Sequence, residues 1–248
     1  SALANLTMNT SGDGDITLTS NIGADTDNAG AAVTAIGNTA TADLNLNGTV
    51  YTTGGATTYA SAGTDLGGSS PTFTTSADTI TFGTANVKVA NGTLTVNSVG
   101  GLIDFEGSIL GTSDEVLVLN ANGSGTDAAS ANEKVIVAAI GTGNQIHSVS
   151  ITGRDGITLE GNITTSNKAS NNVSFTGPVS INAATVAIDT DATGNDGTVT
   201  FSSTIDSTTG TSRNLDIVSA TGNVTVTGAI GATTALASLD INQAGGDG

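Results

Sequence analysis

One short unit recurs along this chain: a glycine, then apolar residues alternating with polar ones, then a second short apolar element. The unit reads GDITLTSNI at 14–22, GLIDFEGSI at 101–109, GITLEGNI at 156–163, GTVTFSSTI at 197–205 and GNVTVTGAI at 222–230. A period of two is typical of a short strand with one buried face, and the glycine marks a turn. Since one such unit cannot bury its apolar face alone, successive units must stack on one another.

The spacing of these strand signals suits a sandwich, a barrel or a solenoid, and the recurrence of the unit favours the solenoid. We therefore predict an all-β fold, a parallel β-solenoid whose coils hold roughly 20–25 residues each. The alternative is a set of β-sandwich fibre subunits that exchange a strand with their neighbours.

The whole chain, residues 1–248, is expected to form one elongated domain cut from a longer tandem array. The basis for this expectation is that LANLTMNTSGDG at 3–14 returns as LASLDINQAGGDG at 236–248. The Thr/Gly-rich stretch 52–70 is predicted to leave the repeat as an irregular excursion. At 130–133 a capping-box pattern favours a helix, but the β-branched run at 135–137 indicates a strand, which is the prediction we adopt.

The composition limits the core and the partners. The chain has 22 acidic and 5 basic residues, a net charge of −17, no Cys, no Trp and only seven aromatic residues, 5 Phe and 2 Tyr. Few large side chains predict a narrow core. The five bases are scattered singly, which argues against nucleic-acid binding because that function requires clustered Lys and Arg. No apolar run approaches the ~20 residues that span a bilayer, so no transmembrane segment is expected.

The residues give little support for catalysis. His147 is the single histidine and there is no cysteine, so Cys/His zinc sites and cysteine–histidine nucleophiles are excluded. Sugar hydrolysis needs a pair of carboxylates, which so acidic a chain can supply. However, the aromatic and basic residues usual in sugar-processing grooves are few. We predict that the protein is not an enzyme.

Two segments share the pattern Asp-Thr-Asp-x-x-Gly, at 25–30 and 189–194. Alternating carboxylates followed by glycine at the sixth position match the first half of a calcium loop. The candidate calcium ligands are Asp25, Asp27, Asp189, Asp191 and Asp196. The bidentate Glu expected at the twelfth position is missing, since Ile36 and Thr200 occupy those places. The alternative interpretation is that these are ordinary turn residues.

Pairs of Thr separated by one residue recur at Thr17/Thr19, Thr79/Thr81, Thr93/Thr95, Thr198/Thr200 and Thr225/Thr227. Stacked on one flat solenoid face, such pairs would order water and bind ice, which is the alternative function. Against it, Asp104 and Glu160 are expected to interrupt the face. The other explanation is that Thr is a common outward residue of strands.

The segments TVTFSSTID at 198–206 and GAIGATTALASL at 228–239 resemble the repeats of filamentous-haemagglutinin-like proteins, which are large repetitive surface proteins of bacteria. The resemblance is best over about 144–248 and extends to 1–25. It implies a right-handed parallel β-helix that is secreted to the cell surface and acts as a structural fibre or adhesin. The implied partners are further copies or neighbouring repeats, stacked head to tail, and cell-surface or matrix glycans.

Overall fold

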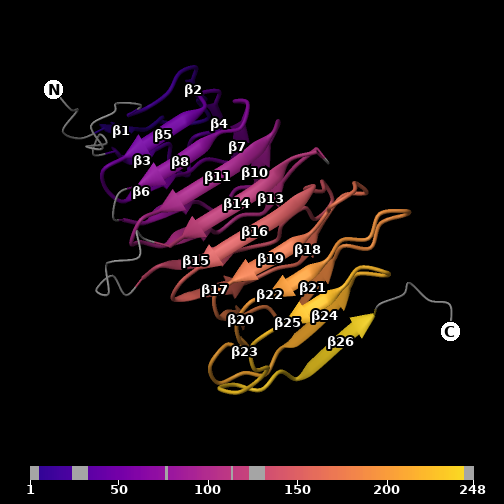
Figure 1. The fold of residues 1–248 in the computed structure, drawn as a ribbon. Coiled ribbons are helices and arrows are strands. Elements are labelled where there is room, and N and C mark those ends of the chain that lie inside the picture. The colour runs from indigo at the N-terminus through magenta and orange to yellow at the C-terminus, as the bar shows by residue number, and fades with distance from the viewer. Residues whose placement is uncertain (1–5, 24–32, 76–77, 113, 123–131, 243–248) are drawn as a thin grey trace.

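The computed structural model describes residues 6–23, 33–75, 78–112, 114–122 and 132–242. In this part of the chain every named element is a strand, there is no helix, and every strand pair is parallel. The strands wind into a right-handed parallel β-helix of about 9 turns, with the first coil and the last coil at opposite ends of the rod (Figure 1). The predicted fold class is confirmed, and parallel pairing between successive coils rules out the alternative of strand-exchanging sandwiches.

The strands form three sheets, which we call A, B and C. Sheet A contains β1 (Leu6–Met8), β3 (Val33–Ile36), β6 (Thr57–Tyr59), β9 (Ile80–Phe82), β12 (Ile103–Phe105), β15 (Lys134–Val137), β17 (Gly156–Leu159), β20 (Val179–Ile181) and β23 (Ile205–Ser207). Sheet C contains β5 (Val50–Thr53), β8 (Thr72–Thr75), β11 (Thr93–Ser98), β14 (Val116–Ala121), β16 (Ser148–Gly153), β19 (Val173–Thr176), β22 (Val199–Phe201) and β25 (Val224–Val226).

Sheet B has two portions, which are joined through bridges from Ile140 to Ile109 and Ile163. The first contains β2 (Ile16–Leu18), β4 (Asp43–Leu46), β7 (Gly63–Leu66), β10 (Val87–Val89) and β13 (Ile109–Leu110). The second contains β18 (Ile163–Thr164), β21 (Thr185–Asp189), β24 (Asn214–Val218) and β26 (Ser238–Asn242).

Inward side chains form ladders because each strand pairs in register with its equivalent one coil later. Tyr59, Phe82 and Phe105 follow one another at intervals of 23 residues in sheet A. Their rings stack with centroids 5.0 Å and 4.4 Å apart. A second stack joins Tyr51 to Phe73 in sheet C at 4.6 Å. These distances match the strand spacing in a sheet, so the narrow core is filled by like side chains stacked on like.

The stretch 52–70 is not an irregular excursion, and that prediction is wrong. It contains the end of β5, all of β6 and all of β7. The strands were not recognised in the sequence because several of their inward positions are Thr and not apolar residues. The hydroxyl groups of these residues are buried, and that of Thr57 donates to the Val33 carbonyl at 2.7 Å. The Tyr51 hydroxyl is likewise satisfied inside, by the Gly48 amide at 2.7 Å. At 134–137 the strand prediction is confirmed by β15.

The two similar terminal segments do not occupy equivalent positions. Leu6 and Met8 lie in β1 of sheet A, whereas their counterparts Leu239 and Ile241 lie in β26 of sheet B. The alternating pattern that they share specifies a strand with one buried face, and all three sheets use that pattern. The similarity therefore shows only that both segments form a strand with one buried face. The two segments do not occupy the same position in the coil.

Candidate functional site

Three of the five candidate calcium ligands lie in the described part of the chain, and the structure gives two of them roles in turns. Asp189 ends β21, and its Oδ1 accepts a hydrogen bond from the Asp191 amide at 3.0 Å. Asp196 accepts hydrogen bonds from the amide and the hydroxyl of Thr221 in the next coil. Burial, followed by repulsion from Asp191, raises the pKa of Asp189.

Within the described residues, no group of three or more His, Asp and Glu side chains has an arrangement that would hold a metal ion. Asp25 and Asp27 lie outside the described residues. The calcium site therefore stays a prediction, and the structure does not gather Asp189, Asp191 and Asp196 into an arrangement that would hold a metal ion.

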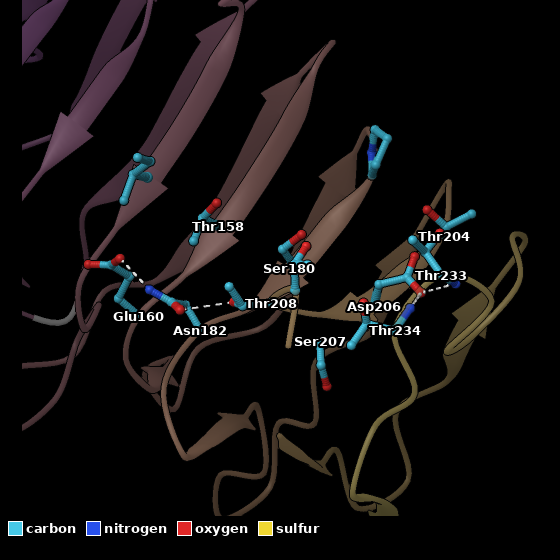
Figure 2. Close-up of a pocket in the computed structure, with 13 residues that line it drawn as sticks. Thr158, Glu160, Ser180, Asn182, Thr204, Asp206, Ser207, Thr208, Thr233 and Thr234 are labelled. Atoms are coloured by element: carbon cyan, nitrogen blue, oxygen red, sulfur yellow. Dashed lines mark hydrogen bonds between the residues drawn. The ribbon is translucent and has the colours of Figure 1, made fainter. Parts of the chain in front are cut away.

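A groove of about 510 Å³ lies on the outward side of sheet A (Figure 2). We call it the sheet A groove. Its floor is a column of outward residues contributed by β15, β17, β20 and β23, in which each residue pairs with the next: Ile136, Thr158, Ser180 and Asp206. Because successive strands are one coil apart, the groove runs along the axis of the rod.

One side of the groove is a polar ladder that follows the strand ends. Asn182 donates from Nδ2 to Glu160 Oε1 at 2.8 Å, and the Thr208 hydroxyl lies 2.9 Å from Asn182 Oδ1. The C-terminal end is closed by a loop, since Asp206 Oδ1 accepts the amides of Thr233 at 2.8 Å and Thr234 at 3.1 Å. These bonds fix the shape of the groove without using all of its polar atoms.

Several polar atoms of the groove have no partner among the described residues. No hydrogen bond reaches Glu160 Oε2, Asp206 Oδ2 or the hydroxyls of Thr158 and Ser180 in that part of the chain. The described lining contains two carboxylates and no Lys, Arg or His. The groove therefore offers acceptors and hydroxyls to a ligand and repels anions.

Sequence reasoning missed this groove because its residues come from four coils and stand 22 to 26 positions apart. Each residue on its own is an ordinary outward strand position. The available signal was a polar residue at the same place in consecutive coils, and reading it requires the register between the coils, which the sequence pattern does not supply.

A concentration of negative charge adjoins the groove. Asp104 of β12 pairs with Ile136 at the N-terminal end of the floor. Burial raises the pKa of Asp104 to about 6, and the carboxylates of Glu106 and Glu160 add to the effect by repulsion. Folding therefore favours the protonated form of Asp104.

Replacing Asp104 with asparagine is expected to stabilise the protein at neutral pH. A carboxyl whose pKa rises from 3.8 to about 6 on folding contributes nothing below pH 3.8, becomes destabilising as the pH rises through this window, and is fully destabilising above it. Because this side chain is only half-buried, solvent screening reduces the expected gain at pH 7 to about 1 kcal/mol. Urea unfolding of both proteins at pH 7 and pH 3.5 measures it. An equal difference at both pH values would contradict the assignment.

The outward side of sheet C differs from the other two faces, because its eight strands carry no charged residue. One column runs through all eight in register: Val50, Thr72, Thr95, Val118, Ser150, Ser174, Thr200 and Thr225. A parallel column contains Thr52, Thr74, Asn97, Asn120, Thr152 and Thr176. We call this surface the sheet C face.

Of the five Thr pairs singled out in the sequence, three reach sheet C: those ending at Thr95, Thr200 and Thr227. Thr17 lies in sheet B and Thr81 in sheet A. The expected interruption by acidic residues is wrong for sheet C, since Asp104 lies in sheet A and Glu160 directly follows a strand of sheet A. These two acidic residues therefore lie away from the sheet C face.

The last coil exposes side chains that its predecessor buries. Ile230, Leu239 and Ile241 are 42%, 38% and 39% exposed, and they are the only large exposed hydrophobic residues among those described. They continue the ladders of Ile205, Leu215 and Ile217, which are at most 1% exposed. The C-terminal end of the described rod is therefore an open section through the hydrophobic core, which we call the open coil.

In the described part of the chain no helix is long and apolar enough to cross a membrane. No family model, curated protein or solved structure matches the chain.

Proposed function

We propose that this chain is a structural repeat of an extracellular bacterial fibre or adhesin, a stiff rod that stacks on further coils and carries attachment to a surface. The open coil is the observation that carries the proposal. Ile230 at the end of sheet A, and Leu239 and Ile241 at the end of sheet B, are ladder positions with no side chain of a further coil stacked on them among the described residues. Burying the exposed part of these side chains, about 40% of each, under another coil is favourable by about 1 kcal/mol for each.

The other end of the rod has the complementary chemistry. Leu6, Met8, Leu18 and Ile22 of the first coil are only partly buried and pack against the core from one side. Strand edges at both ends also expose backbone groups that pair with a neighbouring strand. A head-to-tail neighbour, whether a second copy or a further repeat, would cover these partly buried side chains and pair with the exposed strand edges. The acid excess keeps such rods apart laterally, because their side surfaces repel.

The double variant Leu239→Lys/Ile241→Lys is expected to prevent end-to-end assembly. Negative-stain electron microscopy and light scattering compare it with the unmodified chain over a concentration series. The concentration needed for assembly should rise roughly 30-fold, since burial of the exposed parts of the two side chains is worth about 2 kcal/mol together. The matched control is Thr58→Lys/Thr176→Lys, which places the same charge on exposed positions at the sides of interior coils.

Compact single particles of the unmodified chain at every concentration would overturn the stacking proposal. The same series with a calcium chelator tests the metal prediction. Filaments that dissolve only on chelation would support Asp189 and Asp191 as calcium ligands, and filaments unaffected by chelation would argue against them.

A second candidate function, ice binding, is favoured by the sheet C face. Stacked rings place successive coils 4.4 to 5.0 Å apart, which sets the spacing of the hydroxyl columns. In ice, tetrahedral hydrogen bonds of about 2.75 Å put second-neighbour oxygens about 4.5 Å apart. An uncharged face whose columns consist mainly of Thr and Ser at this spacing supports ordered water in a matching lattice.

The ice-binding candidate predicts that Thr95→Lys abolishes inhibition of ice recrystallisation. Thr95 lies in the middle of the sheet C face, so a charged side chain there breaks the lattice contact. Thr58→Lys, an outward position of sheet A, serves as the control and should keep full activity. If the unmodified chain has no effect on ice growth, the candidate is rejected.

A further inference from the structure

We infer that the sheet A groove is a binding site for a linear glycan that is neutral or carries amino groups. This inference adds a ligand to the attachment role proposed above. It rests on that role only in taking the protein to encounter glycans at a cell surface. The groove runs across four consecutive strands of sheet A, so it fits an extended ligand that lies along the axis of the rod.

The chemistry of the lining favours a ligand with hydroxyl groups on all sides. Thr158 and Ser180 present hydroxyls that donate or accept, and Glu160 and Asp206 each present an oxygen that only accepts; none of these atoms has a partner among the described residues. A sugar chain supplies donors and acceptors at every unit. The groups also repeat once per coil, which suits a ligand that is itself a repeat.

Other ligand classes fit less well. The described lining has no basic side chain, and its two carboxylates repel phosphate, sulfate and uronic acids. Its apolar side chains are Ile136 and Pro178, which is too little to anchor a lipid or an apolar peptide. A peptide that adds a strand is also disfavoured, because β15, β17 and β20 are paired on both sides within sheet A. The far edge of β23 is hydrogen-bonded to the segment 229–234.

The two carboxylates add a preference within the glycans. Glu160 is held by Asn182, and Asp206 by the amides of Thr233 and Thr234 (Figure 2). Each carboxylate therefore has a fixed position in the lining and keeps one oxygen without a hydrogen bond among the described residues. A protonated amino sugar therefore gains a charge-assisted hydrogen bond that a neutral sugar lacks. We expect glycans with amino groups to bind more tightly than neutral glycans at low salt, and we expect this difference in affinity to be smaller at high salt.

The test uses calorimetry or NMR titration of the whole chain with three probes of equal length: a neutral cello-oligosaccharide, a chitosan oligomer and an oligogalacturonate. Binding of the first two and not of the third is expected. Ser180→Arg, in the middle of the floor, should weaken binding at least roughly tenfold by filling the groove. Ser174→Arg is the matched control, because it is a half-buried serine at the middle of a neighbouring strand on sheet C.

Thr158→Arg serves as a second variant if Ser180→Arg does not fold, as judged by circular dichroism and thermal unfolding. Binding that survives both variants, binding of the anionic chain alone, or no binding of any probe would overturn the inference. Because the titration is read on single chains, its failure would leave end-to-end stacking untouched. Failure of the stacking experiment would equally leave a positive titration standing.

Discussion

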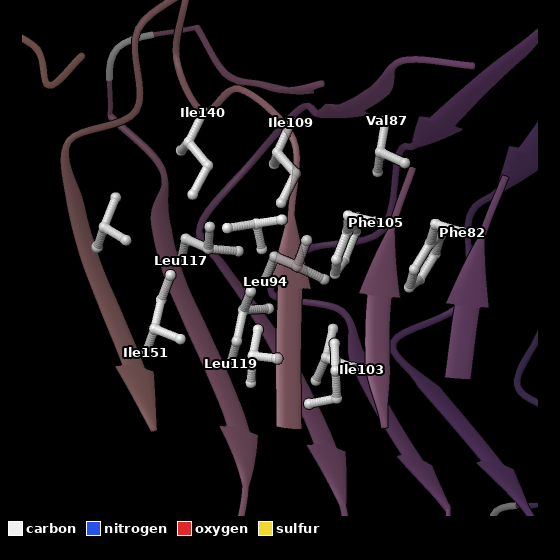
Figure 3. Packing of buried hydrophobic residues seen from close by; sticks show 14 of the residues in the cluster. Phe82, Val87, Leu94, Ile103, Phe105, Ile109, Leu117, Leu119, Ile140 and Ile151 are labelled. Atoms are coloured by element: carbon white, nitrogen blue, oxygen red, sulfur yellow. The ribbon is translucent and has the colours of Figure 1, made fainter. Parts of the chain in front are cut away.

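Replacing Phe82 with alanine is expected to lower the free energy of unfolding by about 3–5 kcal/mol. The Phe82 ring is fully buried and stacks on Phe105 at 4.4 Å (Figure 3). On its other side it stacks on Tyr59 at 5.0 Å. It also meets the edge of Phe73 at 5.2 Å, which ties the ladder of sheet A to that of sheet C. Alanine would leave a cavity between rigid neighbours that cannot collapse into it, because the coil spacing is fixed by backbone hydrogen bonds.

Chemical denaturation monitored by circular dichroism measures this loss. Thr81→Ala is the control, since Thr81 precedes Phe82 in the same strand and points outward, so its effect should stay within about 0.5 kcal/mol. In a solenoid each coil contacts only its neighbours, so the damage should be local and hydrogen exchange should rise first around β6, β9 and β12. A loss below about 1 kcal/mol would mean that the ring stack does not hold the core together.

Removing the charge of Arg154 should produce the second large effect. Its Nε lies 2.7 Å from Oε2 of Glu133, whose side chain is fully buried. Arg154→Met therefore removes the cationic partner of a buried carboxylate. We expect a loss of about 2–3 kcal/mol, below the range for fully buried pairs, because the arginine side chain is still 34% exposed.

The double variant Arg154→Met/Glu133→Gln separates loss of the pair from loss of packing. If charge burial causes the damage, the double variant should be more stable than Arg154→Met alone, by about 1–2 kcal/mol. Lys134→Met, a charge removal at an exposed position next to Glu133, is the control and should have little effect. A double variant as unstable as the sum of the two single ones would show that the two side chains act independently.

The inward and outward alternation could be predicted from the sequence, residue by residue. Ile157, Leu159, Val199 and Phe201 are apolar positions of the alternating units at 156–163 and 197–205, and all four are at most 1% exposed. The prediction failed at 52–70, where buried Thr57 and Thr64 break the usual association of burial with apolar side chains. Their hydroxyls are satisfied by groups inside the coil, and no sequence pattern reports such a partner.

The sequence by itself determined that this chain forms short strands with one buried face, because a period of two admits no other regular structure. Only the tertiary structure decided which sheet each strand joins: the units at 14–22, 156–163 and 222–230 begin in sheets B, A and C respectively. The reason is that coil length varies, from 20 residues between Leu46 and Leu66 to 32 between Phe105 and Val137. The register between coils is set by backbone pairing and core stacking, and it alone creates the sheet A groove, the sheet C face and the open coil.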